Sequence, residues 1–390
     1  MSAIQIPSEL LELRQSIRDF IEREVKPVEA KYAQELQETG AIANGEEEKK
    51  KIRRKSADVG FYQLHMPEEL GGGGLSYLGQ VLIHEEVHRH GSFLAARGGV
   101  LPSVEGPTPI FRVASEDLRQ RYLEPLMRAE KEMCFALTEP EAGSDAAQIR
   151  TRAEQKNGVY ILNGRKHFIT HGAEADFAVV FAVTDMEKRA RGGITAFIVE
   201  KGWPGFEVTR LQRTASTVDL PAELTFDNVE VHDALRRKLT SVPRLRWQLA
   251  KGGRLHIAAS ALGIAQHLFD NMLDYARTRR AFGQLIGKNQ YVQGYVVDSW
   301  CELESARGFV YEMASRIDDG SDGRREAAAA KLVATEMVGR IADRAIQVYG
   351  GNGFMTEMGI ERFWREVRAQ RLYEGTSEIL RTNIAKTLGL

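Results

Sequence analysis

The segment Asn157-Gly-Val-Tyr-Ile-Leu-Asn-Gly164 marks the point at which the chain changes to strand-forming sequence. Its four central residues are β-branched, aromatic or apolar, and an Asn-Gly pair bounds them on each side. The second pair, Asn163-Gly164, is the residue choice that two-residue type I′ hairpin loops need, so we expect a hairpin there. Apolar stretches follow at 177–183, 194–199 and 223–231. Short strands at this spacing predict a small β-sandwich or β-barrel.

Helix-forming sequence lies on both sides of these strands. From Ser8 onward apolar residues recur at helical spacing, with Ser8 placed to cap the first turn and Pro27 to end the helix near Val25. No segment before about residue 130 has strand character. After about residue 239, helix formers dominate, and a helical bundle is expected. The predicted helices of this part cover 254–277, 290–317, 325–349 and 376–388.

Composition and charge exclude several classes of protein. The 390 residues allow two or three domains, and 43% hydrophobic with 27% charged residues is typical of a packed protein in water. A formal net charge of −1 argues against nucleic-acid partners, and no apolar run approaches the roughly 20 residues that span a bilayer. Cys134 and Cys301 show no CxxC pairing, which argues against disulfides and favours a reducing, cytoplasmic location.

Two motifs have an ordinary structural interpretation. His84-Glu-Glu-Val-His88 has the H-E-x-x-H spacing of a zinc site, but no downstream residue is marked as a third ligand. We therefore expect a solvated helix face and no metal. The run Gly71-Gly-Gly-Gly74 lacks the Gly-Lys-Ser/Thr ending of a phosphate-binding loop, so a flexible connection is expected.

Other segments carry residues suited to binding or catalysis. Residues 135–145 place hydroxyl groups, Gly and Pro just before the first strands, where backbone N–H groups can face a polar ligand. Strand alternation turns Phe168 and Thr170 to one side. Glu374 precedes Gly375, which allows a ligand to approach the backbone closely, at the start of the last helix. Taken singly, these features are equally compatible with a turn, a core aromatic residue and a surface glutamate.

Four motifs, taken together, resemble the acyl-coenzyme A dehydrogenase family of flavoproteins, in order and over nearly the whole chain. The resemblance implies a multidomain α and β fold: an all-α N-terminal domain over 1–130, a central β-barrel over 131–240 and a C-terminal four-helix bundle over 241–390. The motifs are Thr138-Glu-Pro-Glu-Ala-Gly-Ser-Asp145, Leu162-Asn-Gly-Arg-Lys-His-Phe-Ile-Thr-His-Gly172, Arg279-Arg-Ala-Phe-Gly283 with Gln290, and Gly350-Gly-Asn-Gly353 with Tyr373-Glu-Gly-Thr-Ser377.

The resemblance also implies bound FAD and a residue set around it. Phe168 and Thr170 would cover the flavin ring and hydrogen-bond near its reactive nitrogen. The residues expected to line the flavin and its substrate side are Phe135, Leu137, Thr138, Gly143 and Ser144. Thr376 and Glu378 are expected to contact the phosphate and adenosine portions of FAD. The residues expected to reach a neighbouring subunit's FAD are Arg279, Phe282, Gln290, Gln347 and Gly351. A homotetramer, or at least a dimer, follows from the last group.

The implied reaction is desaturation of an acyl-CoA thioester to a trans-2-enoyl-CoA. Glu374 matches the family's base, which removes the α-proton from a partly dry, buried position while the flavin accepts the β-hydride. Hydrogen bonds to the thioester carbonyl, one from the backbone N–H of the base, stabilise the enolate. Electrons pass to an electron-transferring flavoprotein by the same resemblance. Expected substrate-side residues are Ser144, Arg254, Tyr373 and Gly375.

The sequence departs from the family at positions that bear on the acyl group. Gly253 stands where some relatives carry the base, so Glu374 has no competitor, and Lys251 stands where several carry an acidic residue. Phe168 replaces a common tryptophan, and Arg97 could meet a substrate carboxylate, although a surface position is the simpler interpretation. An acyl-CoA oxidase or flavin monooxygenase on the same scaffold, or a catalytically idle assembly scaffold, are the alternatives.

Overall fold

The computed structural model describes residues 5–39, 41–96, 98–215, 220–232 and 242–390. The chain forms two compact units that are not continuous in sequence. The helical unit comprises Met1–Ile52, Leu75–Val100 and Ala250–Leu390, and the sheet unit comprises Arg53–Gly74 and Leu101–Leu249. The division into three domains with boundaries at 130/131 and 240/241 stays a prediction.

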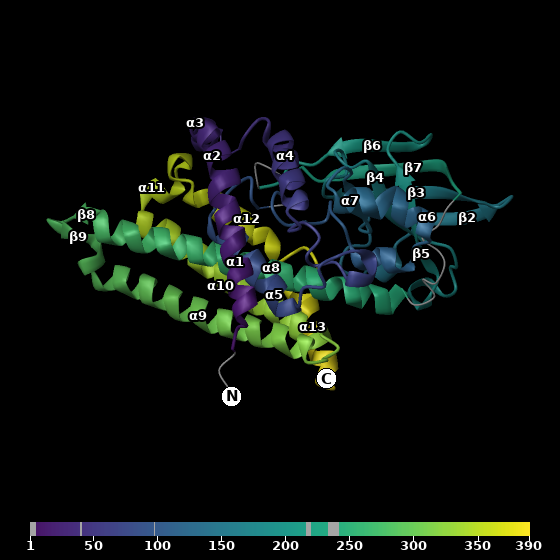
Figure 1. The fold of residues 1–390 in the computed structure, drawn as a ribbon. Coiled ribbons are helices and arrows are strands. Elements are labelled where there is room, and N and C mark those ends of the chain that lie inside the picture. Colours follow the sequence, from purple (N-terminus) through teal and green to yellow (C-terminus); the bar gives the residue numbers. More distant parts are fainter. Residues whose placement is uncertain (1–4, 40, 97, 216–219, 233–241) are drawn as a thin grey trace. The chain divides into compact units, whose positions relative to one another are not determined.

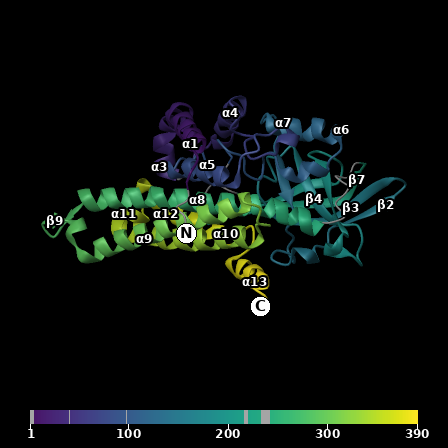
Figure 2. The ribbon, with the colours of Figure 1, turned by 60° about the horizontal axis from the view of Figure 1, so that its bottom comes forward.

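Long helices form the helical unit (Figures 1 and 2). The predicted C-terminal helices are confirmed to within one residue where α9, α10 and α13 begin and end, whereas α12 was not predicted. Both α4 and α8 cross from one unit into the other. The helices are α1 (Ser8–Phe20), α2 (Lys26–Glu29), α3 (Ala33–Thr39), α4 (Gly45–Asp58), α5 (Tyr77–Arg89), α8 (Val242–Thr278), α9 (Gln290–Asp318), α10 (Arg324–Tyr349), α11 (Gly351–Phe354), α12 (Ile360–Gln370) and α13 (Ser377–Thr387).

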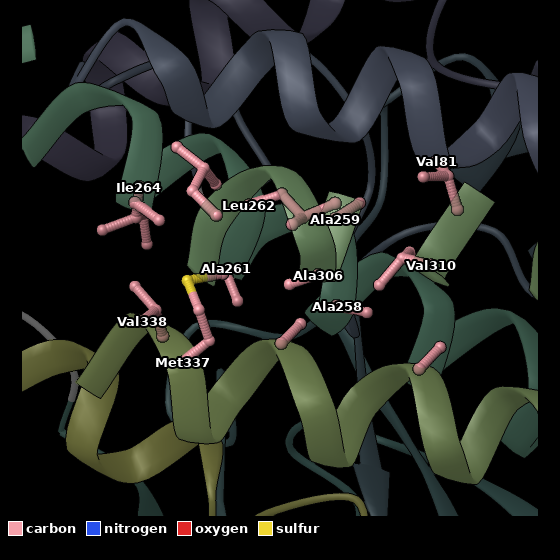
Figure 3. Close-up of a cluster of buried hydrophobic side chains, with 14 of the residues drawn as sticks. Val81, Ala258, Ala259, Ala261, Leu262, Ile264, Ala306, Val310, Met337 and Val338 are labelled. Atoms are coloured by element: carbon pink, nitrogen blue, oxygen red, sulfur yellow. The ribbon is translucent and has the colours of Figure 1, made fainter. Parts of the chain in front are cut away.

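Small side chains hold the core of this unit together (Figure 3). Ala258, Ala259 and Ala261 of α8 are fully buried and pack beside Val310 of α9 and Val338 of α10. Alanine at a helix crossing lets the backbones approach closely, so larger residues there would overpack the interface. This packing fixes the mutual positions of α8 and α10, the two helices that later supply the cations of the candidate site.

A seven-stranded sheet forms the second unit (Figure 1). The pairing runs β1-β4-β2-β3-β7-β6, with β5 antiparallel to β4 and β1 parallel to it. Among the described residues the sheet has open edges at β5 and β6, so the expected barrel is a half-barrel. The strands are β1 (Met133–Ala136), β2 (Arg152–Lys156), β3 (Val159–Ile169), β4 (Phe177–Val183), β5 (Ile194–Glu200), β6 (Phe206–Leu211) and β7 (Ala222–Val231).

Both faces of this sheet are covered at β4, whose seven residues are all buried. Phe177, Val179 and Phe181 pack on one face with Tyr122 and other residues of the short helical segments before β1. The alternate residues of β4 pack on the other face with those of β3 and β7. A strand buried on both sides needs a continuous apolar run, which explains why 177–183 contains no polar residue.

The predicted hairpin at Asn163-Gly164 is wrong. β3 continues through this pair with a β-bulge, and the hairpin turn is the earlier pair, Asn157-Gly158, with φ of +50° and +87°. Gly164 is needed for another reason: a Cβ there would lie 2.4 Å from the Thr151 hydroxyl oxygen and 2.7 Å from its Cα. The glycine therefore allows close approach of two backbone segments inside the sheet.

The first helix also differs from the prediction. Pro7, not Ser8, occupies the N-cap position, and no side chain caps the helix there. Pro27 does not end the helical path, because a π-helical turn over Ile21–Val25 precedes α2 and places the proline in the first turn of that helix. None of the described helices combines the length and apolar character that a bilayer crossing requires.

Candidate active site

The turn between α12 and α13 carries Glu374 in a strained conformation. Glu374 has a φ of +55° and Gly375 a φ of +99°. A left-handed conformation costs a side-chain-bearing residue on the order of 1 to 2 kcal/mol, so the surrounding contacts must hold it. Gly375 follows because a second positive φ suits a residue without Cβ.

Two buried cations hold this turn by its backbone. Lys331 of α10, fully buried, donates from Nζ to the carbonyl of Tyr373 at 2.5 Å and to that of Gly375 at 2.7 Å. Arg254 of α8 donates from Nε to the carbonyl of Glu374 at 3.3 Å. Three successive carbonyls of the turn are thus held by Lys331 and Arg254, an arrangement we call the carbonyl clamp.

The carbonyl clamp decides where the N–H of Glu374 points. The chain has no cis peptide among the described residues, so the N–H of Glu374 lies opposite the carbonyl of Tyr373 in their shared peptide plane. Because Lys331 holds that carbonyl, the N–H is directed away from Nζ. It makes no hydrogen bond to any described residue. The same residue therefore offers one free backbone donor and one carboxylate.

The side chain of Glu374 lies beside α8 and is exposed. Its carboxyl group is 3.7 to 3.8 Å from the position that a Cβ on Gly253 would take, so a side chain at 253 would touch it. The expectation of a buried base is wrong for the described chain, in which Glu374 is an exposed residue. The reason is its place on the turn that connects α12 and α13, outside both helices.

Glu336 of α10 fixes both ends of the same turn. Its carboxylate accepts from the guanidinium of Arg371 at 3.0 Å and from the Ser377 hydroxyl at 2.7 Å. Thr376 caps α13, accepting from the N–H of Ile379 at 3.3 Å. Glu378 lies in the first turn of α13, and hydrogen bonds from its own N–H and from Thr376 lower its pKa. The turn is consequently held from α10 along its whole length.

In the sheet unit, the first two predicted motifs lie together. The N–H of His167 donates to the carbonyl of Thr138 at 2.8 Å, and Lys166 Nζ donates to the carbonyl of Leu137 at 3.0 Å. Lys166 also pairs with Glu139 at 2.7 Å, both nearly fully buried. Burial lowers the pKa of Lys166 to about 8, although the charge of Glu139 acts in the opposite direction.

Phe168 and Thr170 are presented on the exposed side of β3 and its end. Ile169 between them is buried, whereas the Phe168 side chain is 60% exposed and Thr170 is exposed just after the strand ends. Phe168 has a φ of +57° and lies in a second irregularity of the β3–β7 register. Phe135, Leu137 and Thr138 are half-buried, and Gly143 and Ser144 are exposed in the loop after β1.

The remaining predicted residues lie at one end of the helical unit, away from Glu374. Arg279, Phe282 and Gln290 are exposed around the β8–β9 hairpin (Arg280–Ala281 and Gln284–Leu285), and Gln347 and Gly351 are exposed where α10 ends (Figure 1). Stacking of the aromatic rings of α8 and α10 joins these ends, with Tyr275 and Tyr349 at 4.0 Å between ring centroids. Sixteen residues of α10 separate Lys331 from Gln347, about 24 Å along a helix.

Residues of the H-E-x-x-H motif contact side chains of α8 and α9. Glu85 accepts hydrogen bonds from Arg307 and from Tyr311, both on α9. His84 is buried, so the predicted solvated face is wrong for it, and its ring stacks on that of His256 at 4.0 Å. The described residues contain no group of three His, Cys, Asp or Glu arranged for a metal ion. Arg97 lies outside the described residues.

A hollow in the sheet unit lies away from the predicted site residues. It measures about 900 Å³ and is lined by residues of β2, the end of β4 and the following loop, among them Arg152, Asp185 and Lys188. None of the predicted site residues lines it. The hollow therefore gives no support to the predicted site.

Sequence reasoning missed Lys331, Glu336, Lys166 and Glu139. Lys331 and Glu336 lie inside α10, Lys166 lies inside β3 and Glu139 follows β1; of the four, Lys331 stands in an apolar run, directly after Ala327-Ala-Ala-Ala330. A charged residue on a buried helix face is unusual and is most often paired. That signal points to a buried polar contact, but it does not name the partner.

The sequence of this chain is similar to those of known protein families and of individual characterised proteins. Residues 7–130, 134–229 and 243–389 match, in order, the families described as acyl-CoA dehydrogenase N-terminal, middle and C-terminal domains. The chain belongs to the acyl-CoA dehydrogenase family. It is 35% identical to an acyl-CoA dehydrogenase of Bacillus subtilis, covering 99% of each chain, and 36% identical to a 3-(aryl)acrylate reductase of Clostridium sporogenes, covering 96% and 97%.

Solved structures of acyl-CoA dehydrogenases have the same fold as this chain. Butyryl-CoA dehydrogenase from Megasphaera elsdenii superposes with a TM-score of 0.86 at 29% identity, over 99% of this chain and 100% of that one. A structure described as the FAD complex of PigA has the same TM-score at 26% identity, covering 99% of both chains. The chain is also 32% identical to a subunit of the caffeyl-CoA reductase–Etf complex of Acetobacterium woodii, over 94% of each chain.

The Lys166–Glu139 pair gives a prediction about the scaffold of the sheet motifs. Lys166→Met leaves the Glu139 carboxylate buried without its cation, and we expect a loss of about 3 to 5 kcal/mol in the free energy of unfolding, measured by urea denaturation. The double variant Lys166→Met/Glu139→Gln should recover at least half of that loss, because no uncompensated charge remains. Equal stability of the single variant and the wild type would contradict this account of the pair.

Proposed function

We propose that the protein dehydrogenates an acyl-CoA thioester to the trans-2-enoyl-CoA, with Glu374 as the base that removes the α-proton. The supporting observation is the turn at 373–375, where one residue offers a carboxylate and a backbone N–H without an internal partner. Membership of the acyl-CoA dehydrogenase family makes the chain an oxidoreductase of this class. The residue assignment is our proposal.

Each part of Glu374 has a separate task in this reaction. The thioester oxygen accepts a hydrogen bond from the N–H of Glu374, which stabilises the negative charge that develops as the α-carbon loses its proton. The carboxylate takes that proton. The absence of a side chain at Gly253 leaves the acyl group room against α8 beside the carboxylate. The bound thioester itself covers the exposed carboxylate and excludes water from it.

The cofactor is FAD, as in the family's solved structures. When bound, it supplies the acceptor for the β-hydrogen and its electron pair. The sheet unit fits a flat ring: Phe168 holds an exposed aromatic side chain at a positive φ, Thr170 two residues later is exposed, and a Cβ on Gly143 would meet nothing within 4 Å. Phe135, Leu137, Thr138 and Ser144 complete this side, and Thr376 and Glu378 would hold its polar portions.

The proposal includes assembly and electron transfer. The exposed apolar side chains of Phe282, Tyr291, Val297 and Trp300, between 53% and 98% exposed, support a homotetramer in which Arg279, Gln290, Gln347 and Gly351 reach a neighbouring subunit's cofactor. An electron-transferring flavoprotein is the proposed electron acceptor, since a relative belongs to a complex named for such a protein. A reducing, cytoplasmic compartment is part of the same proposal.

A second candidate concerns the acyl group and the direction of the reaction. Gln80, His84 and His256 form a polar cluster, with His256 Nε2 2.9 Å from Gln80 Oε1. His256 follows Gly253 by three residues, which is about one helical turn from the base. Two relatives are named as reductases of aryl-acrylate and caffeyl-CoA. These observations favour aryl or hydroxylated acyl groups, on which the same residues can run the reaction toward reduction.

Replacement of the base gives the first test. Glu374→Gln should purify with FAD bound, because the amide keeps the size of the side chain. Flavin reduction by acyl-CoA under anaerobic conditions should fall at least 1,000-fold, since a neutral amide cannot take the α-proton. Flavin absorbance after mixing with a panel of acyl-CoA thioesters measures this. Full reduction in the variant would remove Glu374 from the role.

The polar cluster gives a test of the acyl group. In the wild type, 3-(4-hydroxyphenyl)propionyl-CoA should react with a higher kcat/KM than octanoyl-CoA. His256→Leu should lower kcat/KM for the hydroxyaryl substrate about tenfold, the effect of one lost hydrogen bond. Butyryl-CoA, whose short chain carries no polar group, is the control and should change less than threefold. Equal losses for both substrates would contradict a role in selecting the acyl group.

A further inference from the structure

We propose that Lys331 is a positioning residue for α-proton abstraction: its ammonium group holds the Tyr373–Glu374 peptide plane so that the N–H and the carboxylate of Glu374 face one thioester together. The inference rests on the proposed function and deepens it. It concerns a residue on a different helix, 43 positions before the base, that touches neither substrate nor cofactor in this account.

The charge of Lys331 lies in an unusual environment. Nζ is fully buried, and its hydrogen-bond partners in the described part of the chain are two backbone carbonyls, with no carboxylate at salt-bridge distance. Lys166, the other fully buried lysine discussed above, has Glu139 as a direct partner. A buried ammonium without a carboxylate partner destabilises a fold. Lys331 is therefore poorly explained as a contribution to global stability.

The contacts of Lys331 surround Glu374. Both carbonyls that Lys331 holds flank Glu374, and Arg254 holds the carbonyl in between at 3.3 Å. Peptide planarity converts these contacts into a fixed direction for the N–H of Glu374, as described above. Without Lys331 the strained φ of +55° at Glu374 loses two of the three hydrogen bonds that hold its neighbours. The donor and the carboxylate would then no longer share one orientation.

The titration of Lys331 agrees with this account. Burial lowers its pKa to about 8, partly offset by the attraction of Glu374, while Arg254 lowers it further. The charged and titratable groups around Nζ are Glu374 and Tyr373 of the turn and Arg254 of α8. Because the folded pKa lies below the unfolded value of 10.5, this group makes folding more favourable as pH rises from about 8 to 10.5. Loss of the charge should hence favour the fold while it harms catalysis.

The reaction step in question is proton transfer alone. The C–H bond at C2 of the thioester breaks, the proton goes to the Glu374 carboxylate, and the electron pair moves to the thioester oxygen, which accepts from the N–H of Glu374. Return of a deuteron from solvent reverses the step. Acetyl-CoA has C2 protons and no β-carbon, so its exchange in D2O reports this step without any hydride transfer.

The experiment compares Lys331→Met with the wild-type holoenzyme in that exchange, followed by mass spectrometry. We expect exchange to fall at least 100-fold in Lys331→Met, with affinity for acetyl-CoA changed less than threefold and a melting temperature equal to or above that of the wild type. Thr335→Val is the matched control: Thr335 is equally buried on α10, one turn from Lys331, and its hydroxyl bonds only within its own helix. Its exchange rate should match the wild type.

Two results would overturn the proposal. Exchange by folded Lys331→Met within threefold of the wild type shows that the clamp does not orient the base. If exchange in Lys331→Met falls together with the melting temperature, and falls equally in Thr335→Val, the role of Lys331 is structural. If Lys331→Met does not fold, Lys331→Gln, which keeps a hydrogen-bond donor without the charge, is judged by the same criteria.

Failure of the proposed function looks different. In that case neither acetyl-CoA exchange nor flavin reduction by any acyl-CoA occurs in the wild type, and Glu374→Gln changes nothing. Exchange by the wild type that is lost in Glu374→Gln but retained in Lys331→Met rejects only the role of Lys331. The pair of variants therefore separates the two claims.

Discussion

Hydrogen bonds from two buried cations to three successive carbonyls are the constraint on which the site depends. Lys331 and Arg254 come from α10 and α8, helices whose separation is set by an alanine-rich core. The turn that carries Glu374 is short and strained, and nothing in its own sequence would keep it in one conformation. The two helices thus fix the conformation of a connecting turn, which carries both the proposed proton acceptor and the proposed donor to the developing charge.

This arrangement explains why the proposed base can be exposed. Burial of a carboxylate would place it out of reach of a large thioester, whereas a clamped turn fixes it at the surface of the helical unit. Glycine at 253 keeps the facing side of α8 open. In the proposed reaction the protein fixes the position and orientation of the Glu374 carboxylate, and the bound thioester excludes water from it. In the proposed function, the polar cluster of Gln80 and His84 on α5 and His256 on α8 contacts the more distant part of the acyl group.

Much of the fold was predictable from the sequence, and the failures have physical causes. The long helices of the C-terminal part were placed well because their helix formers are continuous over seven or eight turns. The Asn163-Gly164 dipeptide suits both a hairpin turn and a bulge, and the close approach of Thr151, which decides between them, is not visible in the sequence. Pro27 was misread because a preceding π-turn moved it into the first turn of the next helix.

The residues of the candidate site also fall into two groups, those that the sequence could name and those that it could not. Glu374, Phe168 and Thr170 could be named because a motif of several neighbouring residues carries them. The role of Lys331 and the pairing of Lys166 with Glu139 could not be named, since each contact joins residues far apart in sequence; Lys166 and Glu139 lie within two of the quoted motifs, but nothing in those motifs pairs them. Local patterns identify the groups that meet a ligand. The groups that hold them in place become visible only when the packing is known.

The most direct test of the claim that Lys331 orients the N–H of Glu374 is a measurement of how strongly the thioester carbonyl is polarised. Infrared difference spectra of 13C1-labelled acyl-CoA bound to the unreactive Glu374→Gln holoenzyme should show the carbonyl stretch at lower wavenumber than in free acyl-CoA. Adding Lys331→Met should remove most of that displacement, because the N–H at 374 is no longer aimed at the oxygen. An unchanged displacement in the double variant would contradict the account.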